Sequence, residues 1–230
     1  MKKHIPNTIT CCNLVSGCIA IVCALNGNPS MALLWIIIGA VFDFFDGMSA
    51  RLLNVSSPIG KELDSLADDV TFGVAPSCII FNFLCGYHQH NMFLPFVAFL
   101  IAAFSAVRLA KFNLDERQAT SFIGLPTPAN ALFWGALIVS MGDKLHASSA
   151  MMWAVIAMIF ISSYLLVAEL PLFALKFKHW GWKGNEVKYI FVLTSALMII
   201  APVAMGMGVI GIAATIAWYV LLSVVTNKRN

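Results

Sequence analysis

The sequence predicts an all-α polytopic membrane protein with about eight transmembrane helices. Of its 230 residues, 60% are hydrophobic and 11% are charged, and the mean hydropathy is +0.86. A soluble domain has about a quarter of its residues charged, so no separate soluble domain is expected. The apolar segments do not alternate with polar residues, as the strands of a membrane barrel would, and this favours helices.

Eight stretches of the chain reach or approach the ~20 mostly apolar residues that a helix needs to cross a bilayer. The fifth and the seventh are the shortest, but each still has a continuous apolar run. The predicted spans are 9–26, 31–53, 64–86, 92–112, 126–142, 148–170, 187–203 and 206–226.

Lysine and arginine residues fall almost entirely on one side of the predicted membrane, as is typical of the cytoplasmic side. If the N-terminus is cytoplasmic, Lys144 alone of the 14 basic residues lies outside. An even number of spans then places both termini in the cytoplasm. We expect a multi-pass protein of the cell (inner) membrane. The residues predicted inside are Lys2, Lys3, Arg51, Lys61, Arg108, Lys111, Arg117, Lys176, Lys178, Lys183, Lys188, Lys228 and Arg229.

An acidic stretch lies between the second and third predicted spans, in VFDFFDGMSARLLNVSSPIGKELDSLADDV (41–70). It holds six of the 11 acidic residues of the chain. Asp43 and Asp46 are three residues apart, and Asp64 and Asp68 are four apart, so each pair shares one face of a helix. The sequence therefore predicts two acidic helix faces at the cytoplasmic side of the membrane.

Gly47, Pro58 and Gly60 are expected to turn the chain so that the two acidic faces meet. Four converging carboxylates at a membrane boundary need cations, and Arg51 alone cannot neutralise them. All-oxygen ligation suits Mg²⁺ or Mn²⁺, and Ca²⁺ is also compatible. The alternative is a solvated acidic loop, which accounts for Glu62 and for Asp69, off the shared face. It does not account for acids embedded in AVFDFFDG.

Read as D-x2-D-G-x2-A-R-x8-G-x3-D-x3-D, residues 43–68 resemble the signature of the CDP-alcohol phosphatidyltransferase family at every fixed position. These positions are Asp43, Asp46, Gly47, Ala50, Arg51, Gly60, Asp64 and Asp68. Four further stretches resemble the phosphatidylserine synthase branch of the family: PNTITCCNLVSG (6–17), LDSLADDVTFGVAPS (63–77), VRLAKFN (107–113) and FIGLPTPANA (122–131). Lys111 and Asp69 are small departures from the pattern of that branch.

The resemblance implies an enzyme that transfers the phosphatidyl group of CDP-diacylglycerol to the hydroxyl of L-serine and releases CMP. By analogy with the family, Asp43 and Asp64 would bridge two divalent metal ions. Asp46 would complete the first site and Asp68 the second. Asp68 is also the proton acceptor that the family pattern implies, since a serine hydroxyl needs a base as it attacks.

The resemblance also implies binding sites for both substrates. Arg51 can grip phosphate bidentately, and the small Gly47 and Ala50 would let the donor approach the second helix. Arg108 is the first candidate for the serine carboxylate and Lys111 the second; the alternative for both is membrane anchoring. The further candidates for binding CDP-diacylglycerol are Ser57, Asn7 and Thr10, for which helix capping or turn formation is the alternative.

Two parts of the chain are expected: a catalytic core (1–172), and a cytoplasmic loop with two C-terminal membrane helices (173–230). The expected partners are the two substrates, membrane lipid and a second copy in a homodimer, with no nucleic acid. Glycerol 3-phosphate or inositol is an alternative acceptor, although those branches lack the GLPTP pattern. A cation transporter is the alternative from another class, but it would spread its acids over several spans.

Overall fold

The computed structural model describes residues 4–55, 57–87, 93–115, 122–173, 181–182 and 185–227. Its helices are α1 (His4–Leu25), α2 (Pro29–Leu52), α3 (Pro58–Asp68), η1 (Asp69–Val74), α4 (Ala75–Tyr87), η2 (Leu94–Phe99), α5 (Leu100–Leu114), α6 (Thr127–Leu145), α7 (Ser149–Val167), α8 (Glu186–Ala204) and α9 (Ile210–Asn227). Two short strands, β1 (Phe122–Ile123) and β2 (Pro171–Leu172), complete the described elements.

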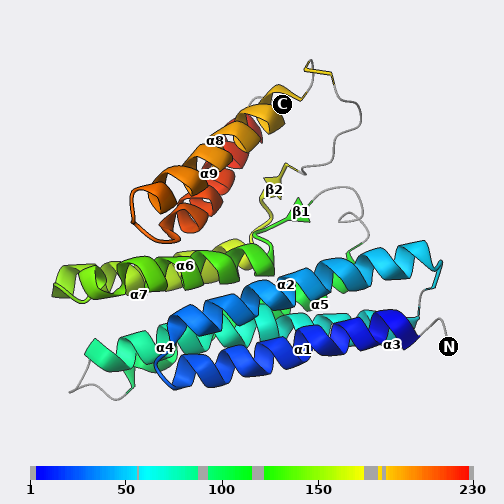
Figure 1. The fold of residues 1–230 in the computed structure, drawn as a ribbon, viewed down its shortest axis with the longest axis horizontal. Helices are drawn as coiled ribbons and strands as arrows, with labels where there is room; N and C mark the ends of the chain where they lie inside the picture. The colour runs from blue at the N-terminus through cyan, green and yellow to red at the C-terminus, as the bar shows by residue number, and fades with distance from the viewer. Residues whose placement is uncertain are drawn as a thin grey trace.

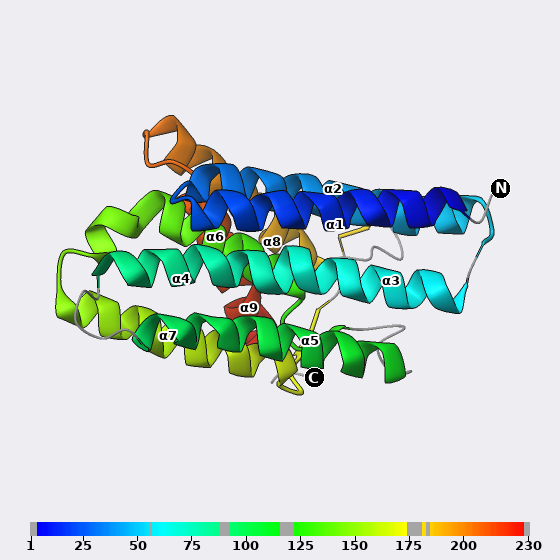
Figure 2. The ribbon, with the colours of Figure 1, turned by 90° about the horizontal axis from the view of Figure 1, so that it is seen from below.

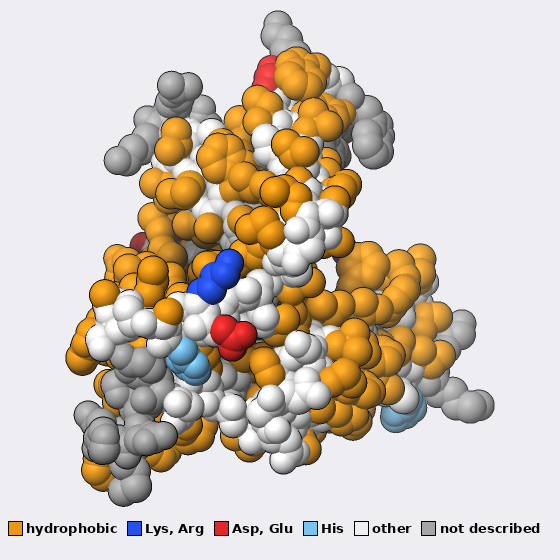
Figure 3. Space-filling model, turned by 60° about the vertical axis from the view of Figure 1, so that its left-hand side comes forward, with side chains coloured by type: hydrophobic (Ala, Val, Ile, Leu, Met, Phe, Trp, Pro, Cys, Tyr) orange, Lys and Arg blue, Asp and Glu red, His pale blue; other side chains and the backbone are white. Residues whose placement is uncertain are grey.

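The helices confirm a multi-pass membrane protein. Because α3, η1 and α4 run on without a break, as do η2 and α5, the described residues form eight continuous helices. Six of these are long and apolar enough to cross a membrane. The other two are α9, whose apolar part is shorter, and α6, which has polar residues at both ends. The surface in Figure 3 agrees, because it is mostly hydrophobic with few charged side chains.

The first five helices lie side by side, and the continuous α3–η1–α4 helix runs between the α1–α2 pair and α5 (Figures 1 and 2). Next to them, α6 and α7 form a second layer. The α8–α9 hairpin is inclined to this bundle and contacts it through α9, which packs on α6. The core is apolar, with Trp134, Phe72 and Ile36 among its largest fully buried side chains.

A π-helical turn, η1, interrupts the third helix directly after Asp68. Two glycines let the neighbouring helices approach this turn. A Cβ atom at Gly17 of α1 would collide with Thr71 and lie 2.9 Å from its Cα atom. A Cβ at Gly39 of α2 would lie 3.0 Å from Asn13 Oδ1 and also collide with Thr71. In this close packing the Thr71 hydroxyl donates to the Asn13 carbonyl at 3.0 Å.

The turn between α2 and α3 differs from the prediction. Gly47 lies inside α2 and Gly60 inside α3, so neither glycine turns the chain. The chain reverses after Leu52, with Asn54 at a φ of 50°. Ser57 is the N-cap of α3 and accepts a hydrogen bond from the Gly60 amide at 3.0 Å, and Pro58 is the first helical residue. The expectation was therefore right for Pro58 and wrong for both glycines.

The small antiparallel ribbon was not predicted. It pairs Phe122 with Leu172 and Ile123 with Pro171. The Leu125 amide also donates to the Leu165 carbonyl at 2.9 Å. The ribbon therefore fixes the segment before α6 against the end of α7.

Five of the six basic residues that the structure describes lie at one end of the bundle. Since consecutive helices alternate in direction, the end of α2, the start of α3 and the end of α5 share a side with the start of α8 (Figure 1). Lys144, in the last turn of α6, lies at the opposite end. The five are Arg51, Lys61, Arg108, Lys111 and Lys188.

The other eight basic residues lie outside the described residues, as does most of the loop predicted after residue 172. The division of the chain at that residue stays a prediction. These basic residues are Lys2, Lys3, Arg117, Lys176, Lys178, Lys183, Lys228 and Arg229.

Candidate active site and metal centre

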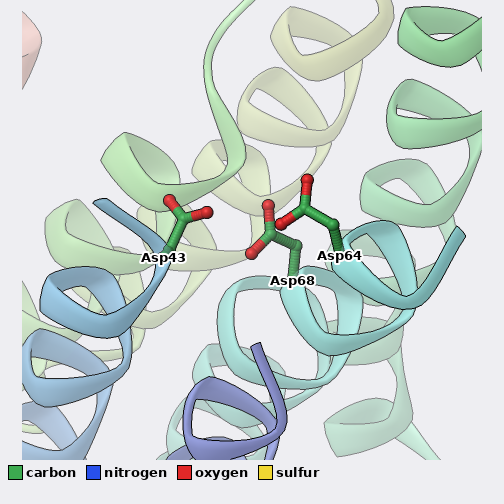
Figure 4. A group of neighbouring side chains, drawn as sticks. All are labelled: Asp43, Asp64 and Asp68. Carbon is green, nitrogen blue, oxygen red and sulfur yellow. The ribbon is translucent and has the colours of Figure 1, made fainter. Parts of the chain in front are cut away.

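Three of the four predicted metal ligands converge. Asp43 comes from α2, and Asp64 and Asp68 come from successive turns of α3 (Figure 4). Each offers a carboxylate oxygen, and these oxygens all lie within 4.8 Å of one another. Asp64 Oδ1 is buried and accepts no hydrogen bond from any residue that the structure describes. Within the described ranges, no lysine or arginine forms an ion pair with any of the three.

This cluster fits a divalent cation. Two like charges 4.8 Å apart repel by on the order of 3 kcal/mol at an effective dielectric constant of about 20. A cation between them replaces this repulsion with attraction, and an all-carboxylate donor set suits a hard ion such as Mg²⁺, Mn²⁺ or Ca²⁺. The buried Oδ1 of Asp64, which has no partner in the described part of the chain, is a further ligand atom.

Asp46, the fourth predicted ligand, lies outside the group of three. Its side chain is buried, and its Oδ2 accepts a hydrogen bond of 2.6 Å from Thr10 Oγ1. Asp46 is still close enough to Asp64 for their charges to repel. Thr10, predicted to bind the donor substrate, therefore orients Asp46. Its other acceptor, the Pro6 carbonyl, lies farther away at 3.0 Å.

Asp68 has a partner that the sequence analysis missed. Asn13 of α1 is fully buried, and its Nδ2 donates to Asp68 Oδ1 at 3.0 Å. The main chain of Asn13 is held in turn by Thr71 in the π-helical turn. The sequence does carry a signal, because Asn13 is an amide within an apolar span, three residues after Thr10 and thus on the same helix face.

A cavity of ≈ 230 Å³ opens beside the acidic cluster. A Cβ atom on Gly47 would have no protein atom closer than Arg51 Nη2, 4.0 Å away, so the absence of a side chain there leaves space for a ligand rather than for protein packing. The cavity brings together five of the six residues predicted to bind the donor. Its lining is Pro6, Asn7, Thr10, Asp46, Gly47, Ala50, Val55, Ser57, Gly60, Lys61 and Asp64.

Two basic residues near this cavity differ from expectation. Arg51, predicted to grip phosphate, does not line the cavity; its side chain is exposed, and its Nε donates to the Gly47 carbonyl at 2.9 Å. Lys61, which was not predicted, does line it, and its Nζ donates to the Asn113 carbonyl of α5 at 2.7 Å. The available signal for Lys61 was its place between Gly60 and Asp64 of the motif.

A second cavity, of ≈ 410 Å³, brings together Arg108 and Lys111, the predicted acceptor-binding residues. Arg108 is only 7% exposed, and its Nε has no hydrogen-bond partner among the described residues. Its charge is close enough to that of Asp68 for the two to attract. The guanidinium also lies over the Phe112 ring, 5.9 Å from its centroid. The other lining residues are Leu114, Asp115, Ile123, Leu166, Val167, Ala168 and Glu169.

Comparison with known proteins identifies the family of the chain. The model of the CDP-alcohol phosphatidyltransferase family matches residues 3–175, which contain the acidic cluster and both cavities. The chain belongs to this family.

Three relatives carry the name CDP-diacylglycerol–serine O-phosphatidyltransferase. The one from Bacillus subtilis (strain 168) is 43% identical over 130 residues, which are 55% of this chain and 70% of the relative. One from Helicobacter pylori (strain ATCC 700392 / 26695) is 30% identical over 229 residues, 98% of this chain and 95% of the relative. One from Saccharomyces cerevisiae (strain ATCC 204508 / S288c) is 38% identical over 154 residues, 60% and 53% of the two chains.

The residues that match the family model include helices α1 to α7, which carry the acidic cluster and both cavities. The family match ends shortly after β2, so α8 and α9 lie beyond it. The H. pylori relative nevertheless aligns with nearly the whole chain, so the C-terminal hairpin is not peculiar to this protein.

Proposed function

We propose that this enzyme transfers the phosphatidyl group of CDP-diacylglycerol to the hydroxyl of L-serine, giving phosphatidylserine and CMP. The observation that carries the proposal is the convergence of Asp43, Asp64 and Asp68 beside a cavity with room at Gly47. Family membership supplies the donor class. The names of the relatives from three distant organisms support serine as the acceptor.

In the proposed reaction the serine hydroxyl oxygen attacks the phosphorus that carries the diacylglycerol. A new P–O bond forms, the P–O bond to CMP breaks, and CMP leaves with that bonding pair. Asp68 takes the hydroxyl proton as the attack proceeds. Asp68 suits this role because it is buried and because Asn13 holds its Oδ1, so that no described hydrogen bond occupies the other oxygen.

We also propose that Asp43, Asp64 and Asp68, with Asp46 beside them, hold divalent metal, Mg²⁺ or Mn²⁺. The family resemblance implies two ions. Bound metal would neutralise the donor pyrophosphate and the charge that develops on the leaving CMP. Thr10 contributes by holding Asp46 in place, and Asn7 and Ser57 contribute polar atoms to the wall of the cavity.

The serine carboxylate is assigned to Arg108. A buried guanidinium with an unpartnered Nε favours an anionic partner, because an unsatisfied buried charge is costly. Its attraction to Asp68, the proposed proton acceptor, supports this assignment. Lys111 lines the same cavity and is the second candidate.

The test is an acceptor panel. Purified protein is incubated with radiolabelled CDP-diacylglycerol, Mg²⁺ or Mn²⁺, and L-serine, glycerol 3-phosphate or inositol, and the lipid product is identified by chromatography. Of the three acceptors, we expect product with serine only, and Asp43→Asn protein should form it at least about 100-fold more slowly. Product with another acceptor but not with serine would overturn the acceptor assignment. No product with any of the three acceptors would overturn the transferase proposal.

We further propose that the site faces the cytoplasm of the cell (inner) membrane, since the acidic cluster lies at the end that holds Arg51 and Lys61. In a cysteine-free background, Glu62→Cys should react with an impermeant reagent only after the membrane is permeabilised. Ala147→Cys, in the turn between α6 and α7, should react in intact cells or spheroplasts. Both positions are exposed in the structure. The reverse pattern would place the site outside. The homodimer stays a prediction.

A further inference from the structure

The end of α5 is tied to α3 by two hydrogen bonds to one residue, Asn113. Lys61 Nζ donates to the Asn113 carbonyl at 2.7 Å, and Asn113 Nδ2 donates to Ser65 Oγ at 2.8 Å. Lys61 and Ser65 are four residues apart and so lie on one face of α3. Ser65 Oγ also donates to the Lys61 carbonyl at 3.3 Å. These three residues form the α3–α5 clamp.

The last turn of α5 is mostly exposed, unlike the middle of the helix. In the middle, α5 packs closely on the π-helical turn, where a Cβ atom on Gly73 would lie 3.0 Å from Ser105 Cβ. In the last turn (111–114), Asn113 is half-buried and the other residues are exposed. The last carbonyls of a helix have no partner within it and carry the negative end of its dipole, so an ammonium group there is favourable. The position of this turn therefore depends strongly on the clamp.

The clamp joins the linings of the two cavities. Lys61 lines the cavity beside Asp64, and the helix that it holds carries Arg108 and Lys111, which line the second cavity. An ammonium group has three N–H donors, and the Asn113 carbonyl takes one of them. The others remain available to an oxygen of an anion in the first cavity. Lys61 can thus hold an anionic ligand and the end of α5 at the same time.

We propose that the α3–α5 clamp couples the two substrate sites, so that a bound pyrophosphate strengthens the binding of the acceptor. This inference rests on the proposed function, which assigns the first cavity to the donor and the second to serine. A donor phosphate on Lys61 fixes the ammonium group against the Asn113 carbonyl, and the end of α5 then holds Arg108 and Lys111 in place. Serine has less ordering left to bring about, and its binding is stronger for that reason. Lys61 is a positioning residue for the acceptor, because it acts through Asn113.

Coupling between two binding sites is reciprocal, so serine must raise the affinity for the pyrophosphate by the same factor. The experiment measures the binding of radiolabelled CDP, which carries the pyrophosphate but no lipid, to the purified full chain in Mg²⁺. It is carried out with and without L-serine. We expect serine to tighten CDP binding to the native protein by at least about fivefold, the lower end of the range typical of coupled sites.

Two variants break the clamp at different points. Lys61→Met removes the ammonium group, and CDP binding itself should weaken by about three- to tenfold, with the serine effect reduced to less than about twofold. Ser65→Ala removes the partner of Asn113 Nδ2, but Ser65 lines neither cavity. CDP binding without serine should stay within about twofold of native in this variant, while the serine effect falls by about two- to tenfold, the worth of one net hydrogen bond.

Glu62→Gln is the matched control, since Glu62 is exposed on the same turn of α3 and lines neither cavity. It should keep both the CDP affinity and the serine effect. The serine effect compares two affinities of one protein, so a general loss of stability does not account for its disappearance.

A serine effect of native size in both clamp variants would refute the coupling. Loss of the effect in Lys61→Met but not in Ser65→Ala would reduce Lys61 to a donor contact and refute the role of Asn113. If serine forms phosphatidylserine in the acceptor panel but leaves the CDP affinity unchanged, the coupling is wrong and the proposed transferase stands. If serine forms no product, the proposed function is wrong and the coupling with it.

Discussion

The acidic end of α2 and α3 and the C-terminal hairpin of α8 and α9 are built in opposite ways. At the acidic end, polar side chains are buried and held from neighbouring helices, as Asp46 is by Thr10 and Asp68 by Asn13. In the hairpin, α8 is largely exposed, and only 11% of its apolar stretch is buried. A membrane tolerates exposed apolar helices without special packing, whereas it tolerates buried acids only where partners or ions hold them.

This difference indicates where change should matter. Side chains of the acidic end are fixed by specific contacts, so small alterations there should propagate to the reacting groups. The hairpin exposes many apolar side chains, and lipid tails are as apolar as leucine, so we expect truncation of an exposed side chain there to change little.

The largest effect is expected at the converging carboxylates. Asp43→Asn and Asp64→Asn should each lower kcat by about 10²- to 10⁴-fold, because each removes a negative ligand from the cluster; a comparable loss is typical when a positioned catalytic group is removed. Excess chelator should abolish turnover of the native enzyme, and Mg²⁺ or Mn²⁺ should restore it. The measurement is initial rate with radiolabelled donor.

Asp69→Asn is the matched control, because Asp69 is adjacent to Asp68 in sequence but outside the group of three. It should lower activity far less. Full turnover in excess chelator would refute the metal centre. Equal sensitivity of Asp69 and Asp64 would show that the acidic face extends into the π-helical turn.

The next effect concerns the acceptor. If Arg108 binds the serine carboxylate, Arg108→Ala should raise the serine KM by about 10- to 150-fold, the loss expected for a hydrogen bond to a charged group. The KM for CDP-diacylglycerol should change little. Arg51→Ala should show the opposite bias if Arg51 turns from the Gly47 carbonyl to the donor phosphate.

Serinol, which lacks the carboxylate, provides a control within the same assay. The preference for serine over serinol should shrink in Arg108→Ala protein. A preference that stays intact would make Arg108 an anchor and would move the carboxylate to Lys111.

A comparable effect is expected at Asn13, which is a positioning residue for Asp68. Asn13→Leu removes the hydrogen bond to a carboxylate, worth about 1.5–3 kcal/mol. Its kcat should fall by about 10- to 150-fold while both KM values stay near those of the native enzyme. Asn13→Asp would place a second charge against Asp68 and should be worse. A fall in kcat that is accompanied by a lower melting temperature and by raised KM values for both substrates would indicate a purely structural role.

The helices and much of the acidic site could be predicted from the sequence, because they depend on composition and on short-range spacing. The eight helices follow from apolar runs, and the approach of Asp43 to Asp64 and Asp68 follows from the spacing within two helices and a tight turn. Five of the six predicted donor-binding residues share one cavity for the same reason. Their roles stay predictions.

What the sequence analysis missed depends on contacts between distant segments. Asn13 and Asp68 are 55 residues apart, and nothing in the pattern of either segment names its partner. The π-helical turn has no periodic signal in the sequence. Gly47 and Gly60 were wrongly predicted to turn the chain, because a glycine can indicate either a turn or a helix position that must stay free of a side chain. The orientation of Arg51 away from the cavity depends on rotamers, which spacing cannot reveal.

The smallest alteration with a predictable effect on stability adds a single carbon atom to α1. Gly17→Ala places a Cβ against the Thr71 backbone, 2.9 Å from Cα, where neither helix can yield without moving the π-helical turn. Such overpacking costs about 1–3 kcal/mol. Leu197→Ala removes three carbons from α8, but its side chain is 68% exposed.

We therefore expect Gly17→Ala to lower both the melting temperature in detergent and the kcat, because Thr71 holds Asn13 and Asn13 holds Asp68. Leu197→Ala should leave kcat and both KM values within about twofold of native, since no described polar contact depends on it and lipid replaces the lost carbons. The ratio of the two effects is the informative quantity. If removal of three carbons from the hairpin harms catalysis more than one carbon added at Gly17, then the hairpin is coupled to the acidic end, and the contact of α9 with α6 is the route to test first.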